Sequence, residues 1–184
     1  MDEAWISVDI EASGPTPGTG SMIAIGACLV DQPEVQFEAT LAPIPGLPWS
    51  PEAERVHGLT REYLATAGTS PESAMRSFVD WVVTVAAGRR PVFVGFNATF
   101  DWMFVTYYLV HFTGESPFGI SGLDIKAYYM GALGKRSWRD TAKGNMDPRF
   151  LSDAPHTHHA LDDAREQAEV FQKVRAYVEA RDAE

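Results

Sequence analysis

One aspartate stands in an otherwise uncharged, apolar stretch of this chain. Asp101 is the only Asp, Glu, Lys or Arg between Arg90 and Glu115. Within this stretch, Pro91 to Gly95 predicts a buried strand, and Thr99 to Phe112 predicts a helix that is apolar on nearly every side and is therefore buried. A buried carboxylate without a partner costs several kcal/mol. Asp101 must therefore bond to backbone N–H groups at the start of the helix, be neutralised, or lie near a metal ion.

The segments before this stretch predict three strands joined by turns. Apolar runs cover Ala4 to Ile10, Met22 to Val30 and Val35 to Leu41, and the first two are separated by a Gly- and Pro-rich segment, Ser13 to Gly20. Three strands in this order predict an antiparallel meander. A short helix over Glu52 to Val56 follows a Pro-rich connection.

Helical patterns alternate with strands in the rest of the chain. Ser70-Pro71 starts a helix that ends near Gly88, and a short strand lies around Ile120 to Leu123. A further helix covers Ile125 to Leu133, before a polar loop that extends to about Pro155. The last helix has an apolar stripe consisting of Leu161, Ala164, Ala168, Phe171, Val174 and Val178, and an outer face consisting of Arg165, Glu166, Glu169 and Lys173. This order predicts an α/β domain in which helices cover both faces of a mixed sheet.

Length and composition predict one domain over residues 1–184. The chain has 184 residues, of which 45% are hydrophobic and 22% are charged, and a chain of this size can bury a core without disulfides or zinc. The single cysteine, Cys28, lies in an apolar run and is expected to be a buried thiol. The first residues carry no basic signal region, and no apolar stretch approaches the ~18 residues of a membrane span. We therefore expect a cytoplasmic protein that does not enter a membrane.

The net charge argues against a protein that passively coats nucleic acid. The chain has 25 acidic and 15 basic residues, which gives a net charge of −10. A site that concentrates carboxylates to bind cations is also acidic, and two Mg²⁺ ions would bring the charge from −10 to −6. Residues 134–149 form a basic loop that contains Lys135, Arg136, Arg139, Lys143 and Arg149.

Two further positions suggest a carboxylate cluster. Asp9 and Glu11 are two residues apart on a predicted strand, so both carboxylates lie on one face and repel unless a cation separates them, although acids at strand ends also cap turns. In the last helix, ~100° per residue directs Asp163 toward the interior and Asp162 toward water.

Three histidines precede these two aspartates. His156, His158 and His159 lie before the helix, so helical periodicity does not rank them. A zinc site is an alternative, but the spacing matches no common zinc motif.

Four carboxylates form a hard-oxygen ligand set. Asp9, Glu11, Asp101 and Asp163 would favour Mg²⁺ or Mn²⁺ over zinc. Two such ions about 3.5–4 Å apart suit in-line attack of water at a phosphorus. A histidine, with an unperturbed pKa near ~6.5, could accept the proton from that water.

Three motifs in order resemble the histidine-containing branch of the DEDD superfamily of 3′–5′ exonucleases. The motifs are Asp9-Ile10-Glu11-Ala12-Ser13-Gly14, Asn97-Ala98-Thr99-Phe100-Asp101 and His158-His159-Ala160-Leu161-Asp162-Asp163. This branch includes the epsilon proofreading subunit of DNA polymerase III, RNase T and oligoribonuclease, and the similarity covers about residues 5–175. The resemblance implies a ribonuclease H-like fold, a mixed five-stranded sheet flanked by helices.

The resemblance also implies a role for each motif residue. Asp9 would bridge two divalent cations, Mg²⁺ or Mn²⁺, Glu11 and Asp163 would complete the shell of the first, and Asp101 would hold the second. His158 would be the general base. Ala12-Ser13 stands where relatives commonly carry Thr before the glycine of the first motif, so a hydroxyl contact to the substrate is shifted or lost.

The implied activity is metal-dependent release of nucleoside 5′-monophosphates from the 3′ ends of single-stranded DNA or RNA. The expected substrate-binding residues are Gly14, Phe100, Arg136, Trp138 and Arg139, because aromatic and cationic side chains together suit single-stranded nucleic acid. His57, in a segment that also resembles this branch, is either structural or a substrate contact. A homodimer or a polymerase partner is possible by the same resemblance. The alternatives are a non-catalytic module that binds nucleic acid or a polymerase, and a phosphodiesterase for small nucleotides.

Overall fold

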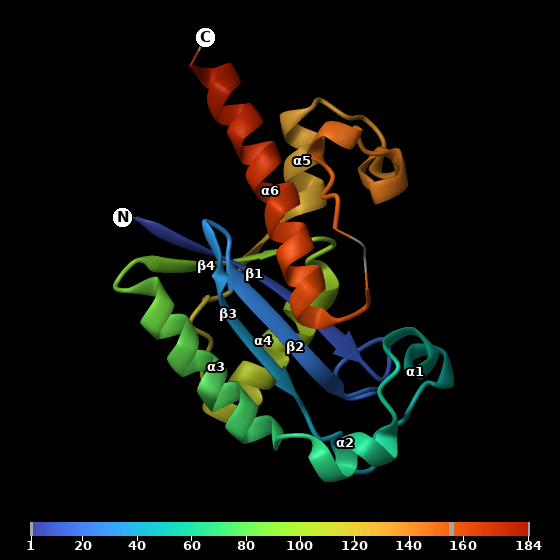
Figure 1. The fold of residues 1–184 in the computed structure, drawn as a ribbon. Helices are drawn as coiled ribbons and strands as arrows, with labels where there is room; N and C mark the ends of the chain where they lie inside the picture. Colours follow the sequence, from blue (N-terminus) through green and yellow to red (C-terminus); the bar gives the residue numbers. More distant parts are fainter. Residues whose placement is uncertain (1, 155–156, 184) are drawn as a thin grey trace.

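A five-stranded mixed sheet forms the centre of the computed structural model, which describes residues 2–154 and 157–183. Its strands are β1 (Glu3–Ala12), β2 (Met22–Leu29), β3 (Gln32–Thr40), β4 (Arg90–Gly95) and β5 (Gly122–Asp124). They lie in the order β3-β2-β1-β4-β5 (Figure 1). β1, β2 and β3 are antiparallel, whereas β4 runs parallel to β1 and β5 runs parallel to β4. The predicted meander and the predicted mixed sheet are therefore confirmed.

Helices cover both faces of the sheet. They are α1 (Pro51–His57), α2 (Arg61–Ala67), α3 (Pro71–Ala86), α4 (Thr99–Thr113), α5 (Ile125–Ala132) and α6 (Ala160–Asp182). α3 and α4 pack on one face, and α5 and α6 pack on the other (Figure 1). None of the helices in the described ranges is long and apolar enough to cross a membrane.

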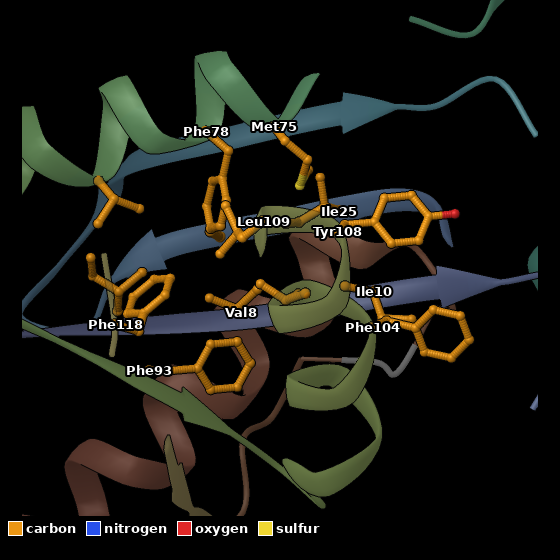
Figure 2. Packing of buried hydrophobic residues seen from close by; sticks show 14 of the residues in the cluster. Val8, Ile10, Ile25, Met75, Phe78, Phe93, Phe104, Tyr108, Leu109 and Phe118 are labelled. Atoms are coloured by element: carbon orange, nitrogen blue, oxygen red, sulfur yellow. The ribbon is translucent and has the colours of Figure 1, made fainter. Parts of the chain in front are cut away.

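Alternation along β1 divides its side chains between these two faces. Val8 and Ile10 point toward α4, where they meet Phe104 and Tyr108 (Figure 2). Ser7 points the other way, and its Oγ donates to the carbonyl of Ala164 in α6 at 2.8 Å. Because side chains alternate along a strand, Asp9 and Glu11 lie on the α6 face with Ser7.

α4 is buried on one side only, which corrects the prediction of a helix surrounded by protein. Phe104, Val105, Tyr108 and Leu109 are buried, but the side of the helix away from the sheet exposes 51% of Val110. The apolar composition of this helix therefore overstates its burial.

The helix α2 is absent from the sequence-based prediction. Thr60 begins it, because its Oγ1 accepts from the N–H of Tyr63, and Leu64 is the buried residue of this helix. A helix with one buried side chain lacks the repeated apolar spacing that reveals a helix in a sequence.

The polar loop predicted after α5 is instead folded. It forms three 3₁₀ turns, η1 (Trp138–Thr141), η2 (Lys143–Asn145) and η3 (Pro148–Phe150). Met146 and Phe150 are buried in the cluster with α5 and α6. Short 3₁₀ turns bury isolated side chains, so they leave little periodic signal.

Glu166 departs from the predicted orientation of α6. The predicted stripe is buried from Leu161 to Val174, whereas its last member, Val178, is only partly buried, and Asp163 is only 3% exposed. Glu166, expected on the outer face, is 6% exposed, because Lys143 approaches it from η2 and forms an ion pair with it. The neutralising lysine comes from a distant segment that helical periodicity does not include.

Candidate active site

The topology of the sheet brings the predicted carboxylates to one edge. β1 and β4 are parallel, so their carboxyl ends lie side by side. Asp9 and Glu11 lie near the end of β1, and Asp101 lies in the first turn of α4, which follows β4. Asp163 lies in the first turn of α6, on the face of the sheet to which Asp9 and Glu11 point.

A glycine in β2 allows α6 to approach the sheet at this edge. Gly26 pairs with Asp9 in the β1–β2 ladder, and a Cβ built at Gly26 would lie 2.2 Å from the backbone nitrogen of Leu161 and 2.4 Å from the carbonyl oxygen of Ala160. Glycine within a strand often marks such a close backbone approach. The position of the first turn of α6, and therefore of Asp163, depends on the absence of a side chain at residue 26.

Gln167 joins the three segments that carry the carboxylates. This side chain is 1% exposed and lies on α6, one turn after Asp163. Its Nε2 donates to the carbonyl of Val8 at 3.0 Å, and its Oε1 accepts from the N–H of Phe96, between β4 and α4, at 2.5 Å. One amide thus links α6 to the strand of Asp9 and to the connection that leads to Asp101.

Asp101 bonds to a backbone N–H, which is one of the outcomes that its isolation suggested. Its Oδ1 accepts from the N–H of Ile10 at 3.1 Å, so the carboxylate is bonded to the backbone between Asp9 and Glu11. Asp124 accepts from the N–H of Ala98 at 2.6 Å, which fixes the start of α4, and its charge raises the pKa of Asp101. The buried carboxylate of Asp101 is thereby held against the other acids.

Crowding perturbs the pKa values of these acids. Burial, followed by the charges of Asp101, Glu11 and Asp163, raises the pKa of Asp9 well above its ordinary value. Burial, followed by Asp163 and Asp101, raises the pKa of Glu11 to about 8. Burial also raises the pKa of Asp101 to about 7. A group of acids that resist ionisation together is stabilised by a bound cation, which offsets their repulsion.

The structure separates His158 from His159. Ligand atoms of His158, Glu11 and Asp163 lie within 4.8 Å of one another, whereas His159 points elsewhere, with its Nε2 3.1 Å from Oε1 of Glu38. His158 has a left-handed backbone with φ of 55°, which costs energy for a residue other than glycine. His156 lies outside the described residues. Of His158 and His159, His158 is the one whose ligand atom lies with those of Glu11 and Asp163.

Gly14 and Ser13 shape the loop after β1. A Cβ at Gly14 would lie 3.1 Å from the Cα of Gly20, so this glycine allows the loop to close on itself. Ser13 is 1% exposed, and its Oγ accepts from the N–H of Ser21 at 2.9 Å. The hydroxyl that replaces the expected threonine is therefore engaged in closing the loop.

The predicted aromatic contacts differ in exposure. Phe100 is partly buried against Phe104, with ring centroids 5.2 Å apart. Trp138 is 50% exposed, and Nζ of Lys126 lies 4.4 Å from the centre of its ring. Both Arg136 and Arg139 are exposed. The exposed surface formed by Trp138, Arg136 and Arg139 thus combines an aromatic ring with positive charge.

His57 lies beside the carboxylate edge. It lines a small cavity of about 80 Å³ together with Glu11 and His158. Its Nδ1 accepts from the N–H of Leu59 at 3.1 Å, and its ring contacts Trp49 edge-on. His57 therefore has a structural role in the turn after α1, and it also lies where it could contact a substrate.

Sequence reasoning did not single out Gly26, Gln167 or Asp124. Gly26 left one usable signal, a glycine inside an apolar strand. Gln167 has backbone partners distant in sequence, so its role becomes visible only in three dimensions. Asp124 caps α5 by accepting from the N–H of Ala127, which its place before that helix could have indicated, but its bond to the N–H of Ala98 becomes visible only in the fold.

The fold and the group of four carboxylates with a histidine define a nuclease of the DEDDh type. The chain belongs to the exonuclease family described as Exonuclease (RNase_T), whose model matches residues 6–171. It is 43% identical over 173 residues to the 3′-5′ DNA exonuclease Cap18 of Escherichia coli, covering 94% of this chain and 91% of that protein. The chain is a 3′–5′ exonuclease of this type.

Two solved structures have the same fold. The nuclease domain of 3′hExo, a DEDDh family member bound to rAMP, aligns with a TM-score of 0.70 at 14% identity and covers 94% of this chain and 92% of its own. Pop2p of S. pombe, in a Mg²⁺- and Mn²⁺-bound form, aligns with a TM-score of 0.64 at 14% identity and covers 94% of this chain and 83% of its own. The predicted ribonuclease H-like fold is confirmed.

Proposed function

We propose that this exonuclease removes nucleoside 5′-monophosphates, one at a time, from the 3′ ends of single-stranded DNA. The observation that carries the proposal is the juxtaposition of His158 with Glu11 and Asp163 beside Asp9 and Asp101. DNA is proposed over RNA because the 43%-identical relative is a DNA exonuclease.

The carboxylates fit Mg²⁺ or Mn²⁺. Asp9, Glu11, Asp101 and Asp163 offer hard oxygen ligands. Burial raises the pKa values of Asp9, Glu11 and Asp101, and repulsion from neighbouring acids adds to the rise for Asp9 and Glu11, so a bound cation is favoured. When bound, divalent cations activate the attacking water and neutralise charge on the phosphate oxygens.

His158 acts as the general base. As water attacks the terminal phosphorus, His158 accepts the proton that the water loses, and the bond from phosphorus to the 3′ oxygen of the upstream strand breaks. The new P–O bond leaves the phosphate on the 5′ oxygen of the released nucleotide. Glu11 and Asp163, each with a ligand atom within 4.8 Å of one of His158, stabilise the positive imidazolium that forms.

The surrounding residues bind the strand. Phe100 and Gly14 border the terminal nucleotide, and Trp138 stacks on an upstream base. Arg136 and Arg139 attract upstream phosphates. A single domain over 1–184, a cytoplasmic location, and a homodimer or polymerase partner remain predictions.

A direct test uses matched single-stranded DNA and RNA oligonucleotides, labelled at the 5′ end, with Mg²⁺, Mn²⁺ or EDTA. We expect stepwise shortening from the 3′ end, faster on DNA, and none in EDTA. Asp9→Asn should abolish cleavage. Asp162→Asn is the matched control, because Asp162 lies beside Asp163 but is half exposed and pairs with Arg165. Equal cleavage by the Asp9→Asn protein, or products that start at internal positions, would contradict the proposal.

The strand-binding residues are tested separately. Replacing Arg136 and Arg139 by alanine should raise the KM for long substrates and flatten its salt dependence, because phosphate contacts release counterions. Trp138→Ala should weaken binding without changing the salt slope. Dinucleotides, which are too short to reach these residues, should be cleaved normally by the double variant and by Trp138→Ala. Equal loss on dinucleotides and long strands would assign these residues to the architecture of the site.

A further inference from the structure

Lys143 belongs to the basic loop, residues 134–149, but it lies apart from the exposed cations of that loop. Its Nζ lies 2.5 Å from Oε2 of Glu166 in α6, and its side chain is only 30% exposed, whereas Arg136 and Arg139 are exposed. The sequence grouped these cations together, but the 3₁₀ turn η2 carries Lys143 toward the sheet.

Because it pairs with Glu166, Lys143 lies beside the cluster of acidic residues in the active site. Glu166 follows Asp163 by three residues, and residues at this spacing lie on the same side of a helix. Nζ of Lys143 also lies 5.1 Å from the ring centre of Phe96, the residue that Gln167 binds at the end of β4. The charge of Lys143 lowers the pKa of Asp9, so the two groups interact electrostatically.

Lys173, a lysine on α6, provides a comparison. Lys173 pairs with Glu169 at 2.7 Å, and its Nζ also donates to the carbonyl of Leu151 at 2.6 Å, as expected for a lysine that fastens a loop to a helix. The ammonium of Lys143 has Glu166 and the face of the Phe96 ring as described contacts, and an ammonium has three N–H donors. The partly exposed ammonium of Lys143 can therefore also donate to a phosphate oxygen.

We infer that Lys143 is a phosphate-binding residue of the active site and that Glu166 positions it. Its ammonium donates to a non-bridging oxygen of the terminal phosphodiester and, after hydrolysis, to the 5′-phosphate of the released nucleotide. This inference rests on the proposed function, because it concerns the same phosphate. The product monoester carries about −1.5 to −2 charges at neutral pH against about −1 for a diester, so the effect is largest on product binding.

Calorimetric titration of deoxyadenosine 5′-monophosphate and of deoxyadenosine, both in Mg²⁺, tests this role. We expect Lys143→Gln to weaken binding of the monophosphate about tenfold or more and to leave binding of the nucleoside within about twofold. Lys173→Gln, the matched control, should leave both affinities unchanged. Glu166→Gln should weaken monophosphate binding in the same direction, because the ammonium loses its anchor.

Lys143→Arg keeps the charge and the pairing with Glu166, so it should restore most of the lost affinity and covers the case in which Lys143→Gln does not fold. Unchanged monophosphate affinity in folded Lys143→Gln, or equal loss for nucleoside and monophosphate, would overturn the inference. Failure of the proposed function is recognised separately, because the unmodified protein would then release no mononucleotide from DNA.

Discussion

Asp101 combines a structural and an electrostatic role in one carboxylate. Its hydrogen bond to the N–H of Ile10 ties α4 to β1, while its charge raises the pKa of Asp9. The sequence left a backbone bond, neutralisation and a nearby metal ion as alternatives for this residue. The structure contains the backbone bond and places Asp101 in the acidic group as well, because Ile10 lies between Asp9 and Glu11.

His158 and His159 provide a test at single-residue resolution. His158→Ala should lower the rate of cleavage about 100-fold or more, because it removes the proposed base, while its effect on metal affinity should be small. His159→Ala should change the rate little, since His159 pairs with Glu38 and Asp162. Single-turnover rates with a labelled oligonucleotide measure both. Exchange of the two phenotypes would mean that the third motif is aligned one residue out of place.

The contact between β2 and α6 depends on Gly26. Gly26→Ala should lower both the free energy of unfolding, by about 1–3 kcal/mol, and the cleavage rate, because the added methyl group meets the backbone of Ala160 and Leu161. Gly131→Ala is the matched control. Gly131 lies in α5, and a Cβ there meets nothing within 4 Å, so alanine should leave the stability unchanged or raise it. Urea unfolding and oligonucleotide cleavage measure the two effects, and a fully active, equally stable Gly26→Ala protein would contradict this account.

Elements with repeated apolar spacing could be predicted from the sequence, whereas elements held by single contacts could not. The strands and α3, α4, α5 and α6 fall where alternation and helical spacing place them. α2 buries one leucine, and η1 to η3 bury isolated side chains. These elements therefore have no repeated apolar spacing that a sequence analysis could detect. The motif carboxylates were found because acids in apolar segments are conspicuous. Gln167 was missed because its partners are backbone groups.

The whole molecule should become less stable without metal as the pH rises. The pKa of Glu11 is raised from 4.5 to about 8 and that of Asp101 from 3.8 to about 7, so the folded chain binds more protons than the unfolded chain between these values. Stability is therefore full below the unfolded pKa values and falls as the pH rises through the folded ones.

Thermal unfolding in EDTA from pH 5 to 8.5 measures this effect. We expect the Tm to fall with pH, and Mg²⁺ to raise the Tm more at pH 8 than at pH 5.5. Glu11→Gln should flatten the pH dependence in EDTA. A Tm that rises toward pH 8 without metal would show that the acids are not crowded in solution.

The docking of α6 on β1 and β2 also determines when the active-site residues come together during synthesis of the chain. A ribosome builds Asp9, Glu11 and Asp101 first, and His158 and Asp163 only with the start of the last helix, which then packs against the first two strands. Contacts between such distant segments form late, because the intervening chain must be ordered first. A growing chain therefore lacks a complete active site until α6 has emerged and docked, and the same event completes the core on that face of the sheet.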